Sequence, residues 1–134
     1  MNSEKYAADL WRRAEEALRT AEADLAVSFD AAASRAYYAA FYAVSALFAL
    51  ERREFVKHSA VHAAVHRDLV KSGRWSLAIG KDYSRLLRLR ETGDYGGGRH
   101  VEEKEACDAV LAAKRIRDAV TQAHPELERC DKTA

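Results

Sequence analysis

Hydrophobic residues recur along the first 25 positions at the spacing of one helix face. Leu10, Ala14, Leu18, Ala21 and Leu25 follow one another at intervals of four, four, three and four residues. This spacing places them on a single stripe of an α-helix. Arginines and glutamates fill many of the positions between them. The pattern predicts an amphipathic first helix with one buried face.

The next segment is apolar nearly all the way round. From Asp30 to about Arg53 it combines many alanines with large residues such as Tyr37, Phe41 and Leu47. A helix of this composition is expected at the centre of a bundle, in contact with several neighbours. Asp30 is expected to be its N-cap, and the alanines are expected to allow a second copy to approach closely in a dimer.

Three further helices are predicted after this central one. The third covers residues 59–71 and is stopped by Gly73, and a short fourth helix covers residues 81–92. The fifth starts near Val101 and ends before Pro125.

No stretch alternates polar and apolar residues for long enough to predict a strand. The predicted fold class is all-α: an antiparallel four-helix bundle with an additional short helix at one end, five helices in all. Residues 1–127 are expected to form a single domain, and residues 128–134 a flexible C-terminal tail.

Composition limits the classes of partner. Hydrophobic residues make up 49% of the 134 positions, which is enough for a core. The net charge of +1 excludes a polycation that coats nucleic acid. No apolar run reaches the roughly 18 residues that a membrane span needs, and the first ten residues do not read as a signal peptide. Cys107 and Cys130 are expected to be thiols in a reducing compartment, so the expectation is a cytoplasmic protein without a membrane partner.

Positive charge concentrates in one part of the chain. Residues 71–100 contain seven basic and three acidic residues, a local charge of +4. Arginine binds phosphate through a planar fork, so this patch can hold RNA, a nucleotide or an acidic partner. The alternative, a solvated face with intrahelical ion pairs, is favoured by sequence alone.

A flexible segment follows the basic helix. Asp94 and Tyr95 precede three glycines, and Arg99 and His100 precede the fifth helix. Backbone N–H groups at a helix N-terminus favour anions, but the segment lacks the Lys-Ser/Thr ending of a P-loop. A mobile loop is therefore the favoured interpretation.

Two other polar features lie on predicted helices. His58, His62 and His66 recur at every fourth position, but a helix spreads them over about 12 Å, too far to share one metal ion. A polar helix face is expected instead, with no metal and no cofactor. Arg35 begins an apolar helix, where a guanidinium needs either a carboxylate partner near the bundle end or a wet cleft.

Three segments resemble the HEPN domain family (higher eukaryotes and prokaryotes nucleotide-binding), in the same order, over about residues 4–122. The first is similar to the signature of the family's second helix, the second to the opening of its third helix, and the third to its Arg-x-x-Ala-Asp-Tyr element. They are Ser34-Arg-Ala-Tyr-Tyr-Ala-Ala-Phe-Tyr-Ala43, Lys57-His-Ser-Ala-Val61 and Leu89-Arg-Glu-Thr-Gly-Asp-Tyr-Gly96.

This resemblance implies a helical bundle that forms a homodimer and is often encoded beside a minimal nucleotidyltransferase as a toxin–antitoxin pair. Many such proteins are metal-independent ribonucleases, in which an Arg stabilises the phosphorane and a His acts as general base. In some pairs a Tyr two residues past that His is adenylylated, and Tyr95 is the corresponding candidate.

The chain departs from the ribonuclease pattern at the histidine. If Tyr95 matches the modified tyrosine, the catalytic His falls at Gly93, four intervening residues after Arg88. Glycine cannot transfer a proton. His100, nine intervening residues after Arg90, is the nearest substitute in the sequence.

The predicted function is therefore a HEPN-domain nucleotide- or RNA-associated protein with a degenerate ribonuclease motif, partner of a minimal nucleotidyltransferase. The alternatives are an active ribonuclease toxin, with Arg90 and His100 as catalytic residues, and a purely structural helical dimer. The residues predicted to bind nucleotide or RNA are Arg35, Arg85, Arg88, Arg90, Asp94, Tyr95 and Arg99.

Overall fold

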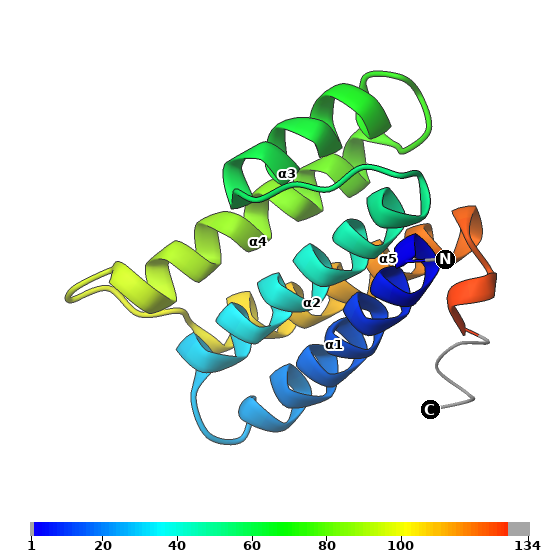
Figure 1. The fold of residues 1–134 in the computed structure, drawn as a ribbon. Coiled ribbons are helices and arrows are strands. Elements are labelled where there is room, and N and C mark those ends of the chain that lie inside the picture. Colours follow the sequence, from blue (N-terminus) through cyan, green and yellow to red (C-terminus); the bar gives the residue numbers. More distant parts are fainter. Residues whose placement is uncertain (1, 129–134) are drawn as a thin grey trace.

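Helices account for all the regular structure in residues 2–128, the part of the chain that the computed structural model describes (Figure 1). The elements are α1 (Asn2–Asp24), α2 (Phe29–Leu50), α3 (His58–Ala64), the π-helix η1 (Val65–Val70), α4 (Leu77–Tyr95) and α5 (Glu103–Ala123). The predicted all-α fold is confirmed. The predicted tail lies, from residue 129 onward, outside the described residues. None of the described helices is both long and apolar enough to cross a membrane.

Helix α2 is the centre of the bundle. It contacts α1, α4 and α5. α1 and α4 run antiparallel to α2, whereas α5 runs parallel to it (Figure 1). α3 and η1 lie against α4 on the outside of the bundle. The short helical element is therefore the third and not the fourth, because α4 has 19 residues whereas α3 has 7.

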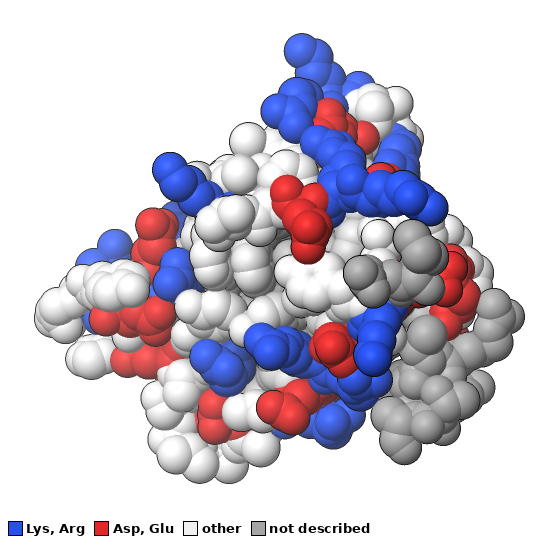
Figure 2. Space-filling view, viewed as in Figure 1, with Lys and Arg blue, Asp and Glu red and all other residues white. Residues whose placement is uncertain are grey.

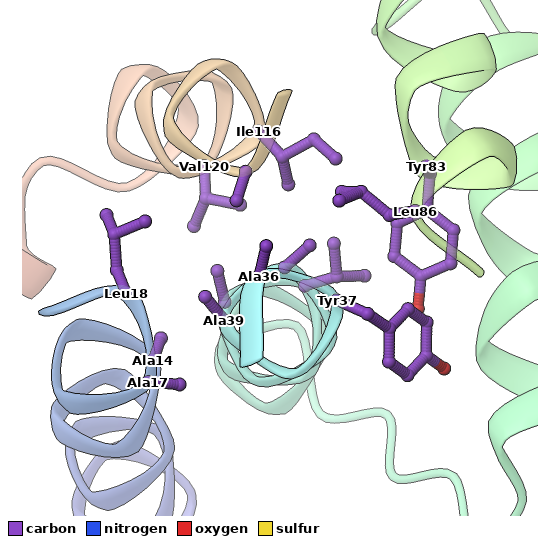
Figure 3. Packing of buried hydrophobic residues seen from close by; sticks show 14 of the residues in the cluster. Ala14, Ala17, Leu18, Ala36, Tyr37, Ala39, Tyr83, Leu86, Ile116 and Val120 are labelled. Atoms are coloured by element: carbon purple, nitrogen blue, oxygen red, sulfur yellow. The ribbon is translucent and has the colours of Figure 1, made fainter. Parts of the chain in front are cut away.

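The alanines of α2 are used inside the chain. Ala36 and Ala39 are buried and lie in the core together with Ala14 and Ala17 of α1 (Figure 3). Small side chains let the two helix backbones approach closely, and the larger Tyr37 fills the side toward α4. The expectation that these alanines form a dimer contact is wrong, because the chain's own helices cover them.

The N-cap of α2 is Ser28 and not Asp30. The Ser28 hydroxyl accepts a hydrogen bond from the backbone N–H of Ala31 at 3.1 Å. Ser28 has the extended backbone of an N-cap, whereas Asp30 already lies in the first helical turn. Its carboxylate accepts a hydrogen bond from the backbone N–H of Val101, at 2.7 Å, and so ties the start of α2 to the segment before α5.

Helix α4 is longer than predicted because its two internal glycines are packing positions rather than helix breakers. A Cβ atom at Gly80 would lie 2.7 Å from a methyl group of Val70 in η1. A Cβ atom at Gly93 would lie 2.9 Å from the backbone carbonyl oxygen of Asp30. Both glycines let a neighbouring element approach the helix closely. Ser76 caps α4 by accepting a hydrogen bond from Ile79 N–H, at 3.2 Å.

Candidate functional site

The three segments that carry the family resemblance meet at one place in the fold. Helix α2 contributes two tyrosines, the start of α3 contributes a histidine, and the last turns of α4 contribute an arginine, an aspartate and a tyrosine. We call this group the Arg90 cluster; it consists of Tyr37, Tyr38, His58, Arg90, Asp94 and Tyr95.

Arg90 is the centre of this cluster. Its guanidinium carbon lies 5.4 Å, 5.5 Å and 5.8 Å from the ring centroids of Tyr37, Tyr38 and Tyr95. Its Nη2 donates a hydrogen bond to the Tyr38 hydroxyl at 3.2 Å, and its Nε lies 3.3 Å from an Asp94 carboxylate oxygen. The side chain is 17% exposed. Aromatic faces stabilise a cation held in this way and fix its orientation.

The guanidinium of Arg90 keeps unused hydrogen-bonding capacity. An arginine side chain has five N–H donors in a planar fork. Among the described residues, Arg90 donates one side-chain hydrogen bond, and its Nε has an ion pair with Asp94 but no hydrogen bond of good geometry. The remaining donors can bind the oxygen atoms of a phosphate, the ligand that a planar fork matches best.

His58 forms the wall of the cluster on the α3 side. Its Nδ1 shares a hydrogen bond of 2.8 Å with the Tyr37 hydroxyl, and its ring stacks on Phe41 with centroids 4.0 Å apart. Burial, and secondly the charge of Arg90, lower the pKa of His58. Burial also raises the pKa of Tyr37. Both groups are therefore neutral at pH 7, and Arg90 and Asp94 are the charged members of the cluster.

His100, the histidine proposed from the sequence, lies elsewhere. Its Nδ1 is 2.7 Å from an Asp30 carboxylate oxygen, and its side chain is 72% exposed. The backbone N–H of Val101, followed by the His100 contact, lowers the pKa of Asp30. No hydrogen bond or ion pair within residues 2–128 joins His100 to Arg90. Arg90 and His100, which the sequence suggests as a catalytic pair, therefore have different partners within one chain.

Position 93, where the resemblance would place the histidine of the ribonuclease pattern, has little room for a side chain. The N-terminal turn of α2 crosses α4 at Gly93, where a Cβ atom would lie 2.9 Å from the Asp30 carbonyl oxygen. The nearest atoms belong to the backbone, which cannot rotate away as a side chain can. A histidine at this position requires the two helices to separate.

The other predicted binding residues differ in their distance from the cluster. The Arg35 guanidinium lies 4.8 Å from the ring centroid of Tyr38, so it joins the cluster through a tyrosine rather than through a carboxylate. Arg88 and Arg99 are exposed, and Arg85 is half-buried. None of these three side chains has a contact with the Arg90 cluster among the described residues. At the start of α5, where an anion site is the less favoured alternative to a mobile loop from the sequence, the side chains of Glu102 and Glu105 form a capping box with the backbone N–H groups.

His62 and His66 contact a serine of α4. The Nε2 atoms of His62 and His66 lie 3.1 Å and 2.9 Å from the Ser84 hydroxyl oxygen. The pair therefore fastens α3 and η1 to α4. Within the described residues there is no group of three or more His, Cys, Asp or Glu side chains suited to a metal ion.

Sequence reasoning missed Tyr37, Tyr38 and His58 as site residues. The tyrosines of the central helix are predicted from the sequence to be core, which is confirmed for Tyr37, and His58 is predicted to be part of a polar face. The available signal was that all three lie in segments that resemble the family's motifs. Residues of separate motifs can be recognised as one site once it is known that α2, α3 and α4 meet.

Comparisons with known proteins identify the family of this chain. The sequence model of the HEPN domain matches residues 7–124. A UPF0332 protein of Thermotoga maritima is 38% identical over 131 residues, which cover 96% of this chain and 99% of the relative. The UPF0332 protein glr0978 of Gloeobacter violaceus is 36% identical over 112 residues, 81% of this chain and 86% of the relative. The chain therefore belongs to the HEPN domain family, which is associated with nucleotides and RNA.

Proposed function

We propose that this protein is a cytoplasmic nucleotide- and RNA-binding HEPN module that acts as a homodimer and as the partner of a minimal nucleotidyltransferase. The observation that carries the proposal is the Arg90 guanidinium, held by three tyrosine rings with donors left for a phosphate. Tyr37 is fully buried, but the exposed ring of Tyr95 and the partly exposed ring of Tyr38 also offer surface on which bases stack. Tyr38 links Arg35 to the same place, which adds a second positive charge.

A binding role is better supported than RNA cleavage. Cleavage through a ribose 2′-hydroxyl needs a general base within hydrogen-bond reach of the reacting group. Glycine occupies the position of the expected histidine, and the nearby helix backbone leaves no room for a side chain. His100 is committed to Asp30 at the end of the bundle. His58 is close to Arg90, but it lies on α3, 32 positions before Arg90, and not at the spacing of the ribonuclease pattern.

Tyr95 is the proposed point of contact with the nucleotidyltransferase. Its side chain is 73% exposed at the end of α4, so its hydroxyl is accessible to another enzyme. The ring lies against Arg90. Transfer of a nucleoside monophosphate from a nucleoside triphosphate to this hydroxyl, with loss of pyrophosphate and of the phenolic proton, would place a phosphate beside the guanidinium and occupy the binding site. Modification would therefore switch RNA binding off.

The test is co-expression with the product of the adjacent gene. We expect the two proteins to purify together and intact mass analysis to show one added nucleotide, which the Tyr95→Phe variant lacks. Tyr6→Phe is the matched control, because it removes another partly exposed tyrosine hydroxyl. Absence of a complex would contradict the proposed partner.

A separate readout tests the absence of cleavage. When the chain is produced alone, we expect cellular RNA to remain intact. RNA fragmentation that disappears with Arg90→Ala or His100→Ala would contradict the binding role and establish a ribonuclease.

A further inference from the structure

A groove lies next to the Arg90 cluster, between α1, α2 and the connection that leads from α2 to α3. Its volume is about 330 Å³, at the lower end of the range for small-molecule sites. His58 and Phe41 line the groove, and His58 also belongs to the Arg90 cluster. The two features are therefore neighbours that share one wall.

Aromatic rings form a continuous path from Arg90 into this groove. Tyr38 lies beside Arg90, and its ring centroid is 6.1 Å from that of Tyr42. Phe41 stacks on His58 and lies 5.6 Å from Tyr42. Tyr6, on the α1 side, is 43% exposed. A planar ligand that enters the groove meets aromatic faces from two helices.

Charged groups stand around the aromatic lining. The Arg13 guanidinium lies 6.0 Å from the Tyr42 ring, and Arg53 lies over the Phe55 ring at 5.1 Å. Glu54 is exposed and has no ion pair among the described residues. Figure 2 shows one face of the molecule, on which uncharged surface and a few Asp and Glu residues lie between two groups of Lys and Arg. Such a site combines stacking surface, positive charge and a hydrogen-bond acceptor.

We propose that this groove binds an unstacked base of single-stranded RNA whose neighbouring phosphate lies at Arg90. The inference rests on the proposed function and adds the class of ligand: a strand of at least two nucleotides rather than a free mononucleotide. Bases in a duplex are stacked and paired, so they cannot enter the groove. Single-stranded RNA supplies bases that stack on aromatic side chains.

The carboxylate of Glu54 gives the groove a preference among bases. A carboxylate accepts hydrogen bonds from an exocyclic amino group, as it does from N4 of cytosine. Adenine and cytosine carry such a group and uracil does not. The groove therefore favours strands of adenine or cytosine over strands of uracil.

A second copy of the chain is the competing occupant of this face. The centre of a protein–protein interface is depleted of charged residues. The groove instead has Arg13, Arg53, Asp9 and Glu54 in its lining. This composition fits a polar ligand with a planar apolar part better than it fits another protein surface.

Fluorescence anisotropy of the full chain with labelled eight-nucleotide strands tests the inference. We expect A8 and C8 to bind more tightly than U8, and a hairpin duplex to bind most weakly. Tyr6→Ala removes one stacking face, so it weakens A8 binding by roughly tenfold, within the range known for one base–aromatic stack. Glu54→Leu, which removes the hydrogen-bond acceptor, reduces the preference for A8 over U8. Leu77→Ala, an exposed apolar residue outside the groove, is the control and leaves binding unchanged.

The outcomes separate this inference from the proposed function. If Arg90→Ala weakens A8 binding while Tyr6→Ala does not, and Glu54→Leu leaves the preference for A8 over U8 unchanged, the groove inference is wrong and the Arg90 site stands. If the unaltered chain binds neither A8 nor AMP, the proposed function itself fails. Should Tyr6→Ala convert a dimer to a monomer in light scattering without changing RNA affinity, the groove is an interface between copies, which overturns the inference.

Discussion

His58 and His100 both lie close to basic residues, but their surroundings in the fold differ. His58 stacks on Phe41, shares a hydrogen bond with Tyr37 and forms part of the wall beside Arg90. His100 follows a run of three glycines and projects into solvent, with Asp30 as its partner. The buried contacts of His58 fix its ring, whereas His100 is attached mainly by one exposed ion pair.

The difference shows that sequence distance is a poor guide to this site. His100 is ten positions from Arg90 in the sequence and shares no contact with it, whereas His58 is 32 positions away and stands in the same cluster. The close crossing of α2 and α4 at Gly93 is the cause, because it brings Tyr37 and Tyr38 onto the arginine. The predictions that follow test this geometry.

The largest effect is expected from filling the helix crossing. Gly93→Ala places a Cβ atom 2.9 Å from the Asp30 carbonyl oxygen, so it should lower the free energy of unfolding by about 1–3 kcal/mol. Gly93→His should cost at least as much, and it should not create ribonuclease activity. Urea unfolding followed by circular dichroism measures both.

Gly98→Ala is the matched control, since a Cβ atom there meets nothing within 4 Å. It should leave the unfolding midpoint nearly unchanged. Equal midpoints for the Gly93 and Gly98 variants would contradict the account of the crossing.

A smaller effect is expected at the hydroxyl that supports His58. Tyr37→Phe keeps the buried ring and removes the hydrogen bond to Nδ1, so it should cost about 1 kcal/mol of unfolding free energy. NMR of the His58 ring should show a changed titration, because the hydroxyl that shares a hydrogen bond with Nδ1 is gone. Tyr42→Phe serves as the control on the same helix. An unchanged His58 titration would show that the bond does not form in solution.

The dependence of stability on pH should report on the two histidines of α3, His58 and His62. Burial lowers the pKa of His58 and of His62 below 6.5 in the folded chain, so the unfolded chain binds more protons in this range. Stability is then complete above about pH 6.5 and falls as the pH drops through the folded-state pKa values. The double variant His58→Gln/His62→Gln should flatten this slope between about pH 7 and pH 5.5.

Two carboxylates affect stability at a lower pH than the histidines do. The hydrogen bonds that lower the pKa of Asp30 and of Glu51 contribute stability above the unfolded values of 3.8 and 4.5, which is lost as the pH falls further. A slope above pH 5.5 that survives in the double histidine variant would contradict the assignment to His58 and His62.

The smallest effect is expected at His100. Because its ion pair with Asp30 is exposed, His100→Ala should change the unfolding free energy by roughly 0.5 kcal/mol or less. It should also leave RNA affinity unchanged. A loss of affinity comparable to that of Arg90→Ala would place His100 in the binding site, across a subunit boundary. It would contradict the conclusion that His58, and not His100, stands at the Arg90 site.

Much of the fold could be predicted from the sequence, because helix periodicity reports burial directly. The stripe Ala106, Ala109, Ala113, Ile116 and Val120 is buried as its spacing indicates. The length of α4 could not be predicted, because a glycine that allows close packing looks the same in a sequence as one that ends a helix. The two kinds of glycine are distinguished only by what lies next to them in the fold, which is Val70 for Gly80 and Asp30 for Gly93.

The site was harder to predict than the fold. Arg90, Asp94 and Tyr95 were named because they form one motif, and they do contact one another in the last turns of α4. Their partners lie on other helices, and the crossing angles that bring these helices together depend on packing that no local pattern encodes. Tyr38 and His58 therefore became recognisable only in three dimensions.

The most direct test of the account is the affinity of three matched chains for single-stranded RNA: the unaltered protein, Arg90→Ala, and Arg19→Ala, which removes an exposed arginine of α1. Anisotropy titrations at several salt concentrations should show at least tenfold weaker binding and a shallower salt dependence for Arg90→Ala. Arg19→Ala should bind within about twofold of the unaltered chain, as expected for one arginine outside the site. Equal affinities for the two variants would contradict the claim that the tyrosine-held Arg90 is the anion-binding centre of this protein.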